Sequence, residues 1–245
     1  MNAEVDTAGI SPQQATTPQA CKLVIFDCDG VLVDSESIAV DLLLELIRAA
    51  GGKITREAAY ERFLGCSLAR IVAELQDRHQ IRVTDGLLES MRVGLYDRFR
   101  KELQPVLAIA GALDRLSQPF CVASSSQPER IRLSLSLTGL EEKFGGNIFS
   151  ATMVKHGKPA PDLFLYAAGQ MGIAPDNCVV VEDSPAGVTA AKSAGMRVIG
   201  FTGGSHAAPA GLDAKVRALE PDLMLNAMDR LPEAIAELEA TRHEA

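Results

Sequence analysis

Residues 22–30 read KLVIFDCDG, and this stretch decides the fold. The run from Lys22 to Phe26 is short, apolar and rich in β-branched residues, which is the pattern of a strand buried on both faces of a sheet. The run stops abruptly at the polar turn Asp27-Cys28-Asp29-Gly30. We therefore predict a buried strand whose carboxyl end carries two aspartates separated by one residue.

The sequence changes character on either side of this strand. Residues 1–21 are mostly small and polar, contain prolines and show no periodicity, so we expect a disordered tail. Residues 36–103 carry apolar residues at helical spacing, as in IAVDLLLELIRAAGG at 38–52, and no strand pattern interrupts them. We predict an all-helical block of roughly 65 residues, inserted after the first strand.

Beyond Pro105 the pattern alternates between strands and helices. Strand-like runs separated by helical segments are PFCVASSS (119–126), NIFSA (147–151), NCVVVEDS (177–184), MRVIGFTGG (196–204) and PDLMLNAM (221–228). Such alternation predicts right-handed crossovers and a parallel sheet covered on both faces. The expected fold class is α/β, with a Rossmann-like core domain formed by residues 22–35 and 104–245 and a small all-helical cap domain formed by residues 36–103.

The composition narrows the classes of function. The chain has 245 residues, 47% of them hydrophobic and 23% charged, which is ordinary for a globular protein. A net charge of −8 gives no general attraction to nucleic acid or to an anionic membrane. The five cysteines form no C-x-x-C pair, and the sequence has neither a long apolar run nor a signal-peptide pattern. We expect a cytoplasmic protein with reduced cysteines, monomeric or weakly dimeric, that binds a small molecule.

Polar residues follow the predicted strands at the point where each one ends. Asp27 and Asp29 follow the first strand, and Glu182 and Asp183 end a later one. Ligands of open parallel sheets bind at the carboxyl ends of the strands, so these carboxylates should meet. They would repel one another without a cation between them, and a set of oxygen ligands favours Mg²⁺. Ser124 and Lys158 add donors for phosphate oxygens.

The strings DCDGVLVDSE (27–36), VASSS (122–126), GKPAPDLF (157–164) and VEDSPAGV (181–188) resemble the four motifs of the haloacid dehalogenase superfamily. The position of the helical insertion resembles the cap of its β-phosphoglucomutase-like and sugar-phosphatase branch. The resemblance implies Asp27 as nucleophile and Asp29 as general acid and base. It implies phosphate binding by Ser124, Ser125 and Lys158. It further implies Mg²⁺ held by Asp27, the backbone carbonyl of Asp29, and Asp183, with Glu182 a direct or water-mediated ligand.

Departures from related branches favour hydrolysis of a phosphate ester. Haloalkanoate dehalogenases lack the second aspartate of the first motif, which this chain has as Asp29. Phosphonate-cleaving relatives use a cap lysine, and neither Lys53 nor Lys101 is well placed for that role. β-Phosphoglucomutases carry a histidine and an arginine in the cap where this chain has Ala39 and Leu68. The favoured activity is a phosphatase, the mutase is the alternative, and a catalytically silent binding protein is a remote third possibility.

Substrate selection should come from the cap, which closes over the strand ends and excludes water in this fold. The expected substrate is a sugar phosphate or a phosphorylated sugar acid such as 6-phosphogluconate. Candidate specificity residues are Gly65, Cys66, Ser67, Arg62, Arg70, Ser126 and Arg130. We expect Cys28 to pack rather than react, because its side chain alternates away from the two aspartates. We interpret His206 as a solvated histidine in a flexible Gly-rich connection.

Overall fold

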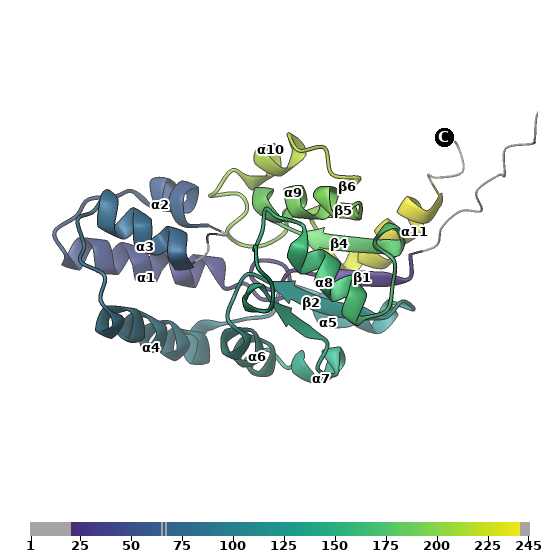
Figure 1. The fold of residues 1–245 in the computed structure, drawn as a ribbon, viewed down its shortest axis with the longest axis horizontal. Helices are drawn as coiled ribbons and strands as arrows, with labels where there is room; N and C mark the ends of the chain where they lie inside the picture. The colour runs from purple at the N-terminus through teal and green to yellow at the C-terminus, as the bar shows by residue number, and fades with distance from the viewer. Residues whose placement is uncertain (1–20, 65, 67, 241–245) are drawn as a thin grey trace, which may run out of the picture.

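The computed structural model describes residues 21–64, 66 and 68–240. Its centre is a six-stranded parallel sheet with the strand order β3-β2-β1-β4-β5-β6. The strands are β1 (Leu23–Phe26), β2 (Phe120–Ser124), β3 (Ile148–Ser150), β4 (Cys178–Glu182), β5 (Arg197–Phe201) and β6 (Leu223–Leu225). This parallel sheet, flanked by helices on both faces, confirms the predicted α/β fold class (Figure 1).

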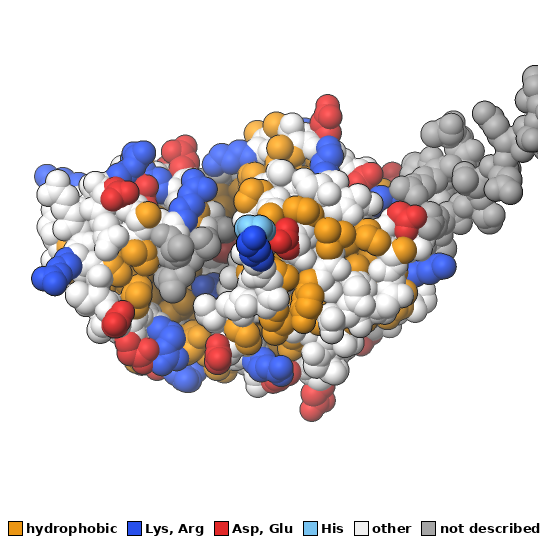
Figure 2. All heavy atoms as spheres, in the orientation of Figure 1, with side chains coloured by type: hydrophobic (Ala, Val, Ile, Leu, Met, Phe, Trp, Pro, Cys, Tyr) orange, Lys and Arg blue, Asp and Glu red, His pale blue; other side chains and the backbone are white. Residues whose placement is uncertain are grey.

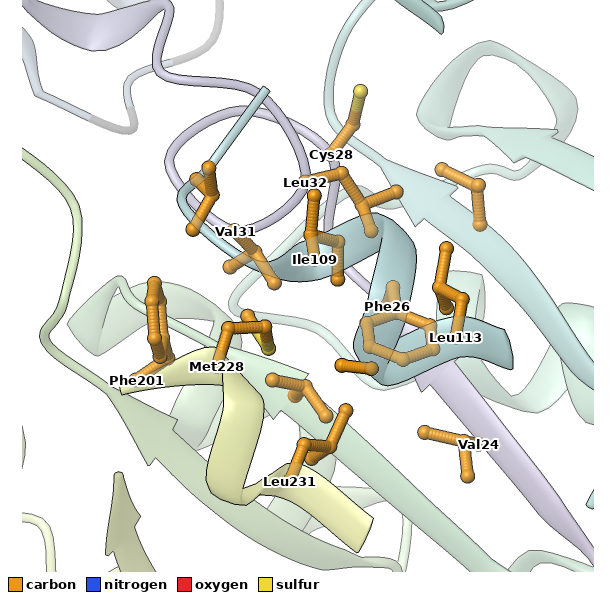
Figure 3. Packing of buried hydrophobic residues seen from close by; sticks show 14 of the residues in the cluster. Val24, Phe26, Cys28, Val31, Leu32, Ile109, Leu113, Phe201, Met228 and Leu231 are labelled. Carbon is orange, nitrogen blue, oxygen red and sulfur yellow. The ribbon is translucent and has the colours of Figure 1, made fainter. Parts of the chain in front are cut away.

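The first strand is buried on both faces because two layers of helices cover the sheet. Val24 and Phe26 point into one hydrophobic cluster, and Leu23 and Ile25 point into the other, as the two-residue period of a strand requires. The first cluster packs helices α5 (Ile109–Arg115), α6 (Pro128–Leu137), α7 (Glu141–Phe144) and α11 (Leu231–Ala240) on the sheet. Figure 3 shows Phe26 packed among Ile109, Leu113 and Leu231 in this cluster.

The opposite face of the sheet is covered by helices from the second half of the chain. They are α8 (Asp162–Gln170), α9 (Pro185–Ser193) and α10 (Leu212–Arg217). Short 3₁₀ turns at Ala151–Met153, Pro175–Asn177 and Met228–Arg230 complete the connections. The helices α5 and α6, which precede β2 and β3, thus lie on one face of the sheet, and α8 and α9, which precede β4 and β5, lie on the other. In the sheet, the strand order reverses between the neighbouring strands β1 and β4. Ligands of such sheets bind at this switch point.

A separate group of helices follows β1, and we call residues 36–103 the cap segment. It contains α1 (Glu36–Ala49), α2 (Arg56–Phe63), α3 (Leu68–Asp77) and α4 (Asp85–Glu102). These helices share a hydrophobic cluster of their own and lie together at one end of the molecule, on the left in Figure 1. Thr55 and Thr84 cap α2 and α4 by accepting from backbone N–H groups of the first turn.

Helix α2 lies within the predicted all-helical block, although its own sequence pattern is weak. Its sequence REAAYERF has a low mean hydropathy and little apolar periodicity, so the local signal for an amphipathic helix is weak. Tertiary packing stabilises the helix, because Ala59, Tyr60 and Phe63 are buried in the hydrophobic cluster of the cap segment. Cys21, the last residue assigned to the tail, is buried, and its N–H donates to Glu239 Oε1 at 2.8 Å. The rest of the expected tail, residues 1–20, lies outside the described residues.

Two features of the molecular surface bear on partners. Acidic and basic side chains are interspersed over the visible face rather than gathered by sign (Figure 2). Among the helices described between residues 21 and 240, none combines the length and apolarity needed to cross a membrane.

Candidate active site

The predicted polar residues meet at the switch point of the sheet. Asp27 follows β1, Ser124 ends β2, and Glu182 ends β4, and these strands are neighbours in the sheet. Lys158 arrives from the loop that precedes α8. Residues from all four motif regions, together with residues of the cap segment, line one cavity of about 610 Å³.

Three carboxylates lie at the centre of this site. Oxygen atoms of Asp27, Glu182 and Asp183 lie within 4.8 Å of one another, and all three residues are buried. The ammonium group of Lys158 donates to Asp27 Oδ1 and to Glu182 Oε2, both at 2.7 Å. Its side chain is only 4% exposed and lies over the ring of Phe164. The sequence analysis expected Lys158 to donate to phosphate oxygens, and the structure shows that the lysine is also the buried counter-charge of the cluster.

The electrostatics of the cluster favour the binding of a cation. Burial raises the pKa of Asp27 well above its usual range, although the charge of Lys158 offsets part of this effect. Burial likewise raises the pKa of Asp183 to about 6, against the opposing hydrogen bond from His206. Neighbouring carboxylates raise both pKa values further, so a positive charge placed beside them would compensate the cluster. A small oxygen-coordinated ion such as Mg²⁺ would supply that compensation, so the donor set fits this metal.

Glu182 is already occupied on both oxygens. Its Oε1 accepts from the backbone N–H groups of Asp183 and Ser184 and from the Ser184 hydroxyl, at 2.8–3.1 Å. Its Oε2 accepts from Lys158. Ser184 also caps α9 by accepting from the N–H of Gly187. Glu182 is thereby fixed by the start of α9, and it holds Lys158 beside Asp27.

Two glycines allow this crowding. A Cβ atom on Gly30, whose φ is +83°, would lie 2.1 Å from Asp183 Oδ2. A Cβ atom on Gly187 would lie 1.9 Å from the carboxyl carbon of Glu182. No larger residue fits at either position without moving a carboxylate, since real Cβ contacts are never this short.

Asp29 accepts hydrogen bonds from three side chains, a different set from the lysine that donates to Asp27. Ser35 Oγ, Ser126 Oγ and Arg130 Nη2 each lie 2.6 Å from one of its carboxylate oxygens. Burial alone would raise the pKa of Asp29, but the Arg130 charge and these hydrogen bonds outweigh burial and lower it. Asp29 is therefore a carboxylate at neutral pH in the unliganded protein, which is the form that acts as a base.

His206 corrects the sequence interpretation. The residue is fully buried, and its Nε2 lies 2.7 Å from Asp183 Oδ2. Burial would lower the pKa of His206, but the contacts with Asp183 and Asp34 outweigh burial and raise it to about 10. The Gly-rich segment around His206 is also anchored, because Ala207 and Ala210 pack into the hydrophobic cluster of the cap segment. Gly-rich composition suggested flexibility, and only the tertiary contacts reveal the anchoring.

The other predicted residues separate into those at the cavity and those away from it. Ser124, Ser125, Ser126, Arg130 and Cys66 line the cavity. Arg62 and Arg70 are not among its lining residues; Arg62 lies 3.5 Å from Glu74 of α3 and borders a different depression. Gly65 and Ser67 lie outside the described residues. Cys28 is buried in the core cluster, as predicted.

Some residues that line the cavity had not been predicted from the sequence as site residues. Glu36, the first residue of α1, lines it beside Asp29 and is buried. On the cap side the lining comes mainly from apolar residues of α1 and α4. The amphipathic pattern identified these as helix faces, but it could not distinguish residues that pack together from residues that face a cavity.

A family model for haloacid dehalogenase-like hydrolases matches residues 21–195, which contain all four motifs. The chain belongs to this family. It is 29% identical to 6-phosphogluconate phosphatase of Escherichia coli, over 76% of this chain and 85% of the relative. It is 30% identical to hexitol phosphatase A of the same organism, over 86% of this chain and 93% of the relative.

A solved structure of a haloacid dehalogenase-like protein of unknown function from Agrobacterium tumefaciens is 38% identical to the chain. The similarity covers 89% of this hydrolase and 98% of that chain, with a TM-score of 0.77. The family resemblance of the four motifs is thus confirmed by sequence and by fold.

Proposed function

We propose that this hydrolase is a magnesium-dependent phosphatase that acts on a small phosphorylated metabolite through an aspartyl-phosphate on Asp27. The observation that carries the proposal is the buried trio Asp27, Glu182 and Asp183 around Lys158 at the switch point of the sheet. The names of the two relatives support the substrate class, since one acts on a phosphorylated sugar acid and the other on hexitol phosphates.

The proposed reaction has two halves. An oxygen of Asp27 attacks phosphorus, the bond from phosphorus to the alcohol oxygen breaks, and Asp29 gives that oxygen a proton. Water then attacks the phosphorylated Asp27, Asp29 takes the proton of the water, and inorganic phosphate leaves. Asp29 must carry a proton in the first half of the reaction. The three hydrogen-bond donors around it in the unliganded site stabilise its deprotonated form, which is the base needed in the second half.

The remaining residues bind and orient the phosphoryl group. Lys158 has three N–H donors, of which two contact Asp27 and Glu182, so the third can reach a phosphoryl oxygen. Ser124 and Ser125 line the same end of the cavity. Asp27 and Asp183 would hold Mg²⁺ together with the backbone carbonyl of Asp29, and the ion would neutralise charge on the phosphoryl group. Because both oxygens of Glu182 are occupied, we assign it a water-mediated contact with the metal.

The alternative activity is a phosphosugar mutase. A mutase must keep its aspartyl-phosphate from water and hand the group to a second hydroxyl. Ala39, which lines the cavity from α1, cannot take part in a proton relay where the mutases have a histidine. Transfer to water is therefore the favoured outcome.

Phosphate release separates the two activities. With Mg²⁺ and a panel of phosphorylated sugars, sugar acids and simple alcohols, we expect stoichiometric inorganic phosphate and no requirement for a bisphosphate activator. Asp27→Asn should abolish release and keep the circular dichroism spectrum, because the amide cannot attack phosphorus. Isomerisation of glucose 1-phosphate to glucose 6-phosphate in the presence of a bisphosphate, with negligible phosphate release, would establish the mutase instead.

A further inference from the structure

The cavity has two chemically different ends. At one end lie the carboxylates of Asp27, Asp29 and Asp183 with Lys158 and Ser124. The other end extends between α1 and α4 of the cap segment. Its volume of about 610 Å³ is within the usual range of small-molecule sites, so it holds more than a phosphate group. What lines the cap end therefore decides which alcohol can be attached to that phosphate.

The cap end is lined mainly by aliphatic side chains at helical spacing. Leu88, Met91 and Leu95 lie on one face of α4, three or four residues apart, and Leu42 faces them from α1. These four residues are half-buried, whereas Leu44 and Ile47 of α1 are buried in the hydrophobic cluster of the cap. The half-buried residues thus present apolar surface to the cavity. A bound apolar group would remove that surface from water.

Each cationic residue of the lining contacts a carboxylate. Lys158 contacts Asp27 and Glu182, and Arg130 contacts Asp29. Arg92, on α4, donates to both carboxylate oxygens of Glu89 at 2.6 and 2.9 Å and lies over the ring of Tyr96.

Acidic residues add to the charge at the cap end. Asp85 and Glu89, at the start of α4, line the cavity there. A second anionic group on the substrate would meet the negative charge of Asp85, while Arg92 is held by Glu89.

Hydroxyl groups on the substrate would also bind poorly at the cap end. Most uncharged polar groups of the described lining, such as Ser124, Ser126 and Thr152, lie at the ends of β2 and β3, toward the phosphate end. Where a polyol chain lies against Leu42, Leu88, Met91 and Leu95, its hydroxyl groups would give up hydrogen bonds to water that aliphatic side chains cannot replace, which weakens its binding.

We propose that the cavity selects phosphate monoesters whose alcohol is uncharged and largely apolar, about six carbons long, over phosphorylated polyols and sugar acids. This inference rests on the proposed phosphatase activity and narrows its substrate class. Leu42, Leu88, Met91 and Leu95 are the specificity-determining residues. The proposal places hexitol phosphates and 6-phosphogluconate, the substrates named for two relatives, among the poor substrates of this chain.

A matched series of esters tests the proposal. n-Hexyl phosphate and hexitol 6-phosphate have the same carbon chain and the same primary ester, and they differ only in five hydroxyl groups. 6-Phosphogluconate adds a carboxylate, and ethyl phosphate is too short to reach the cap. We expect kcat/KM for n-hexyl phosphate to exceed that for the hexitol ester at least 10-fold, because an apolar pocket discriminates against one added hydroxyl group by up to about 100-fold. Equal values, or a preference for either sugar-derived ester, would overturn the proposal.

Variants on two helices locate the effect. Leu88→Asn and Leu42→Asn should each lower the ratio of kcat/KM for n-hexyl phosphate to that for ethyl phosphate about 10-fold. Val93→Asn is the matched control, because Val93 lies on α4, is 46% exposed and does not line the cavity. Because the two substitutions lie on separate helices, misfolding of one variant does not prevent the test. Thermal melting checks that each variant is folded. An unchanged ratio in both folded variants would refute the assignment. If no ester, including ethyl phosphate, released phosphate, the phosphatase activity itself would fail.

Discussion

Glu36 illustrates the cost of placing carboxyl groups close together. It begins α1, lines the cavity and is buried. Burial, reinforced by the charge of Asp29, raises the pKa of Glu36 from 4.5 to about 7. The folded state therefore binds a proton that the unfolded chain has lost, and the stability due to this proton is present below pH 4.5 and disappears as the pH rises through 7.

Replacing Glu36 by glutamine should remove this pH dependence. In the presence of a chelator, Glu36→Gln should be more stable than the wild type by about 3 kcal/mol at pH 8 and by less than about 1 kcal/mol at pH 5, because glutamine stays neutral. Thermal or urea denaturation at the two pH values measures the difference. A variant that gains the same stability at both pH values would show that the pKa of Glu36 is not raised.

At the scale of elements, the start of α9 decides the geometry of the carboxylates. Ser184 caps the helix and donates to Glu182, and Gly187 lies so close to Glu182 that a methyl group does not fit. Helix α9 thus fixes the carboxylate that in turn holds Lys158 beside Asp27.

Gly187→Ala should therefore displace Glu182 and disrupt the site. We expect kcat/KM to fall at least about 100-fold, with a loss of stability of about 1–3 kcal/mol from overpacking. Gly169→Ala in α8 is the matched control, since its added Cβ meets nothing within 4 Å and alanine stabilises a helix by about 0.5–1 kcal/mol. Phosphate release and thermal melting report both effects. Wild-type activity in Gly187→Ala would contradict the role given to α9.

On the scale of the whole molecule, a protein of net charge −8 gathers buried positive charge where it handles phosphate. Lys158, Arg130 and His206 come from separate parts of the core, and each contacts a different aspartate of the site. The segment that carries His206 also packs against the cap segment through Ala207 and Ala210. The segment that carries His206 thus connects the carboxylate cluster to the cap segment.

Magnesium should couple to the stability of the whole protein. Removing divalent ions with a chelator should abolish phosphate release and lower Tm, and returning Mg²⁺ at about 100 times its Kd should restore about 2.7 kcal/mol. For a chain of this length, that energy corresponds to about 5–10 °C. Asp183→Asn should largely lose the Mg²⁺ effect, whereas Asp213→Asn at an exposed position of α10 should keep it. Full activity after exhaustive chelation would rule out the metal.

The sequence by itself determined the sheet and the residues at its strand ends. Buried parallel strands are continuous apolar runs, so β1 and β4 were visible locally, and Asp27 and Glu182 had to lie where those runs stop. The carboxyl ends of parallel strands share one edge, so the sequence predicts that the four motifs meet there. The family resemblance suggested roles for these residues, and the family match and the fold confirm the family.

Only the tertiary structure decided which polar groups are paired and which apolar groups are left facing a cavity. His206 follows a Gly-rich stretch that has no periodic pattern, and its burial against Asp183 arises from contacts 23 residues apart in the chain. Leu44 and Leu88 both belong to apolar helix faces, yet Leu44 is buried in the cap and Leu88 lines the cavity. Local periodicity fixes the face on which a side chain lies, but its partner is fixed by the packing of separate helices, which no local pattern encodes.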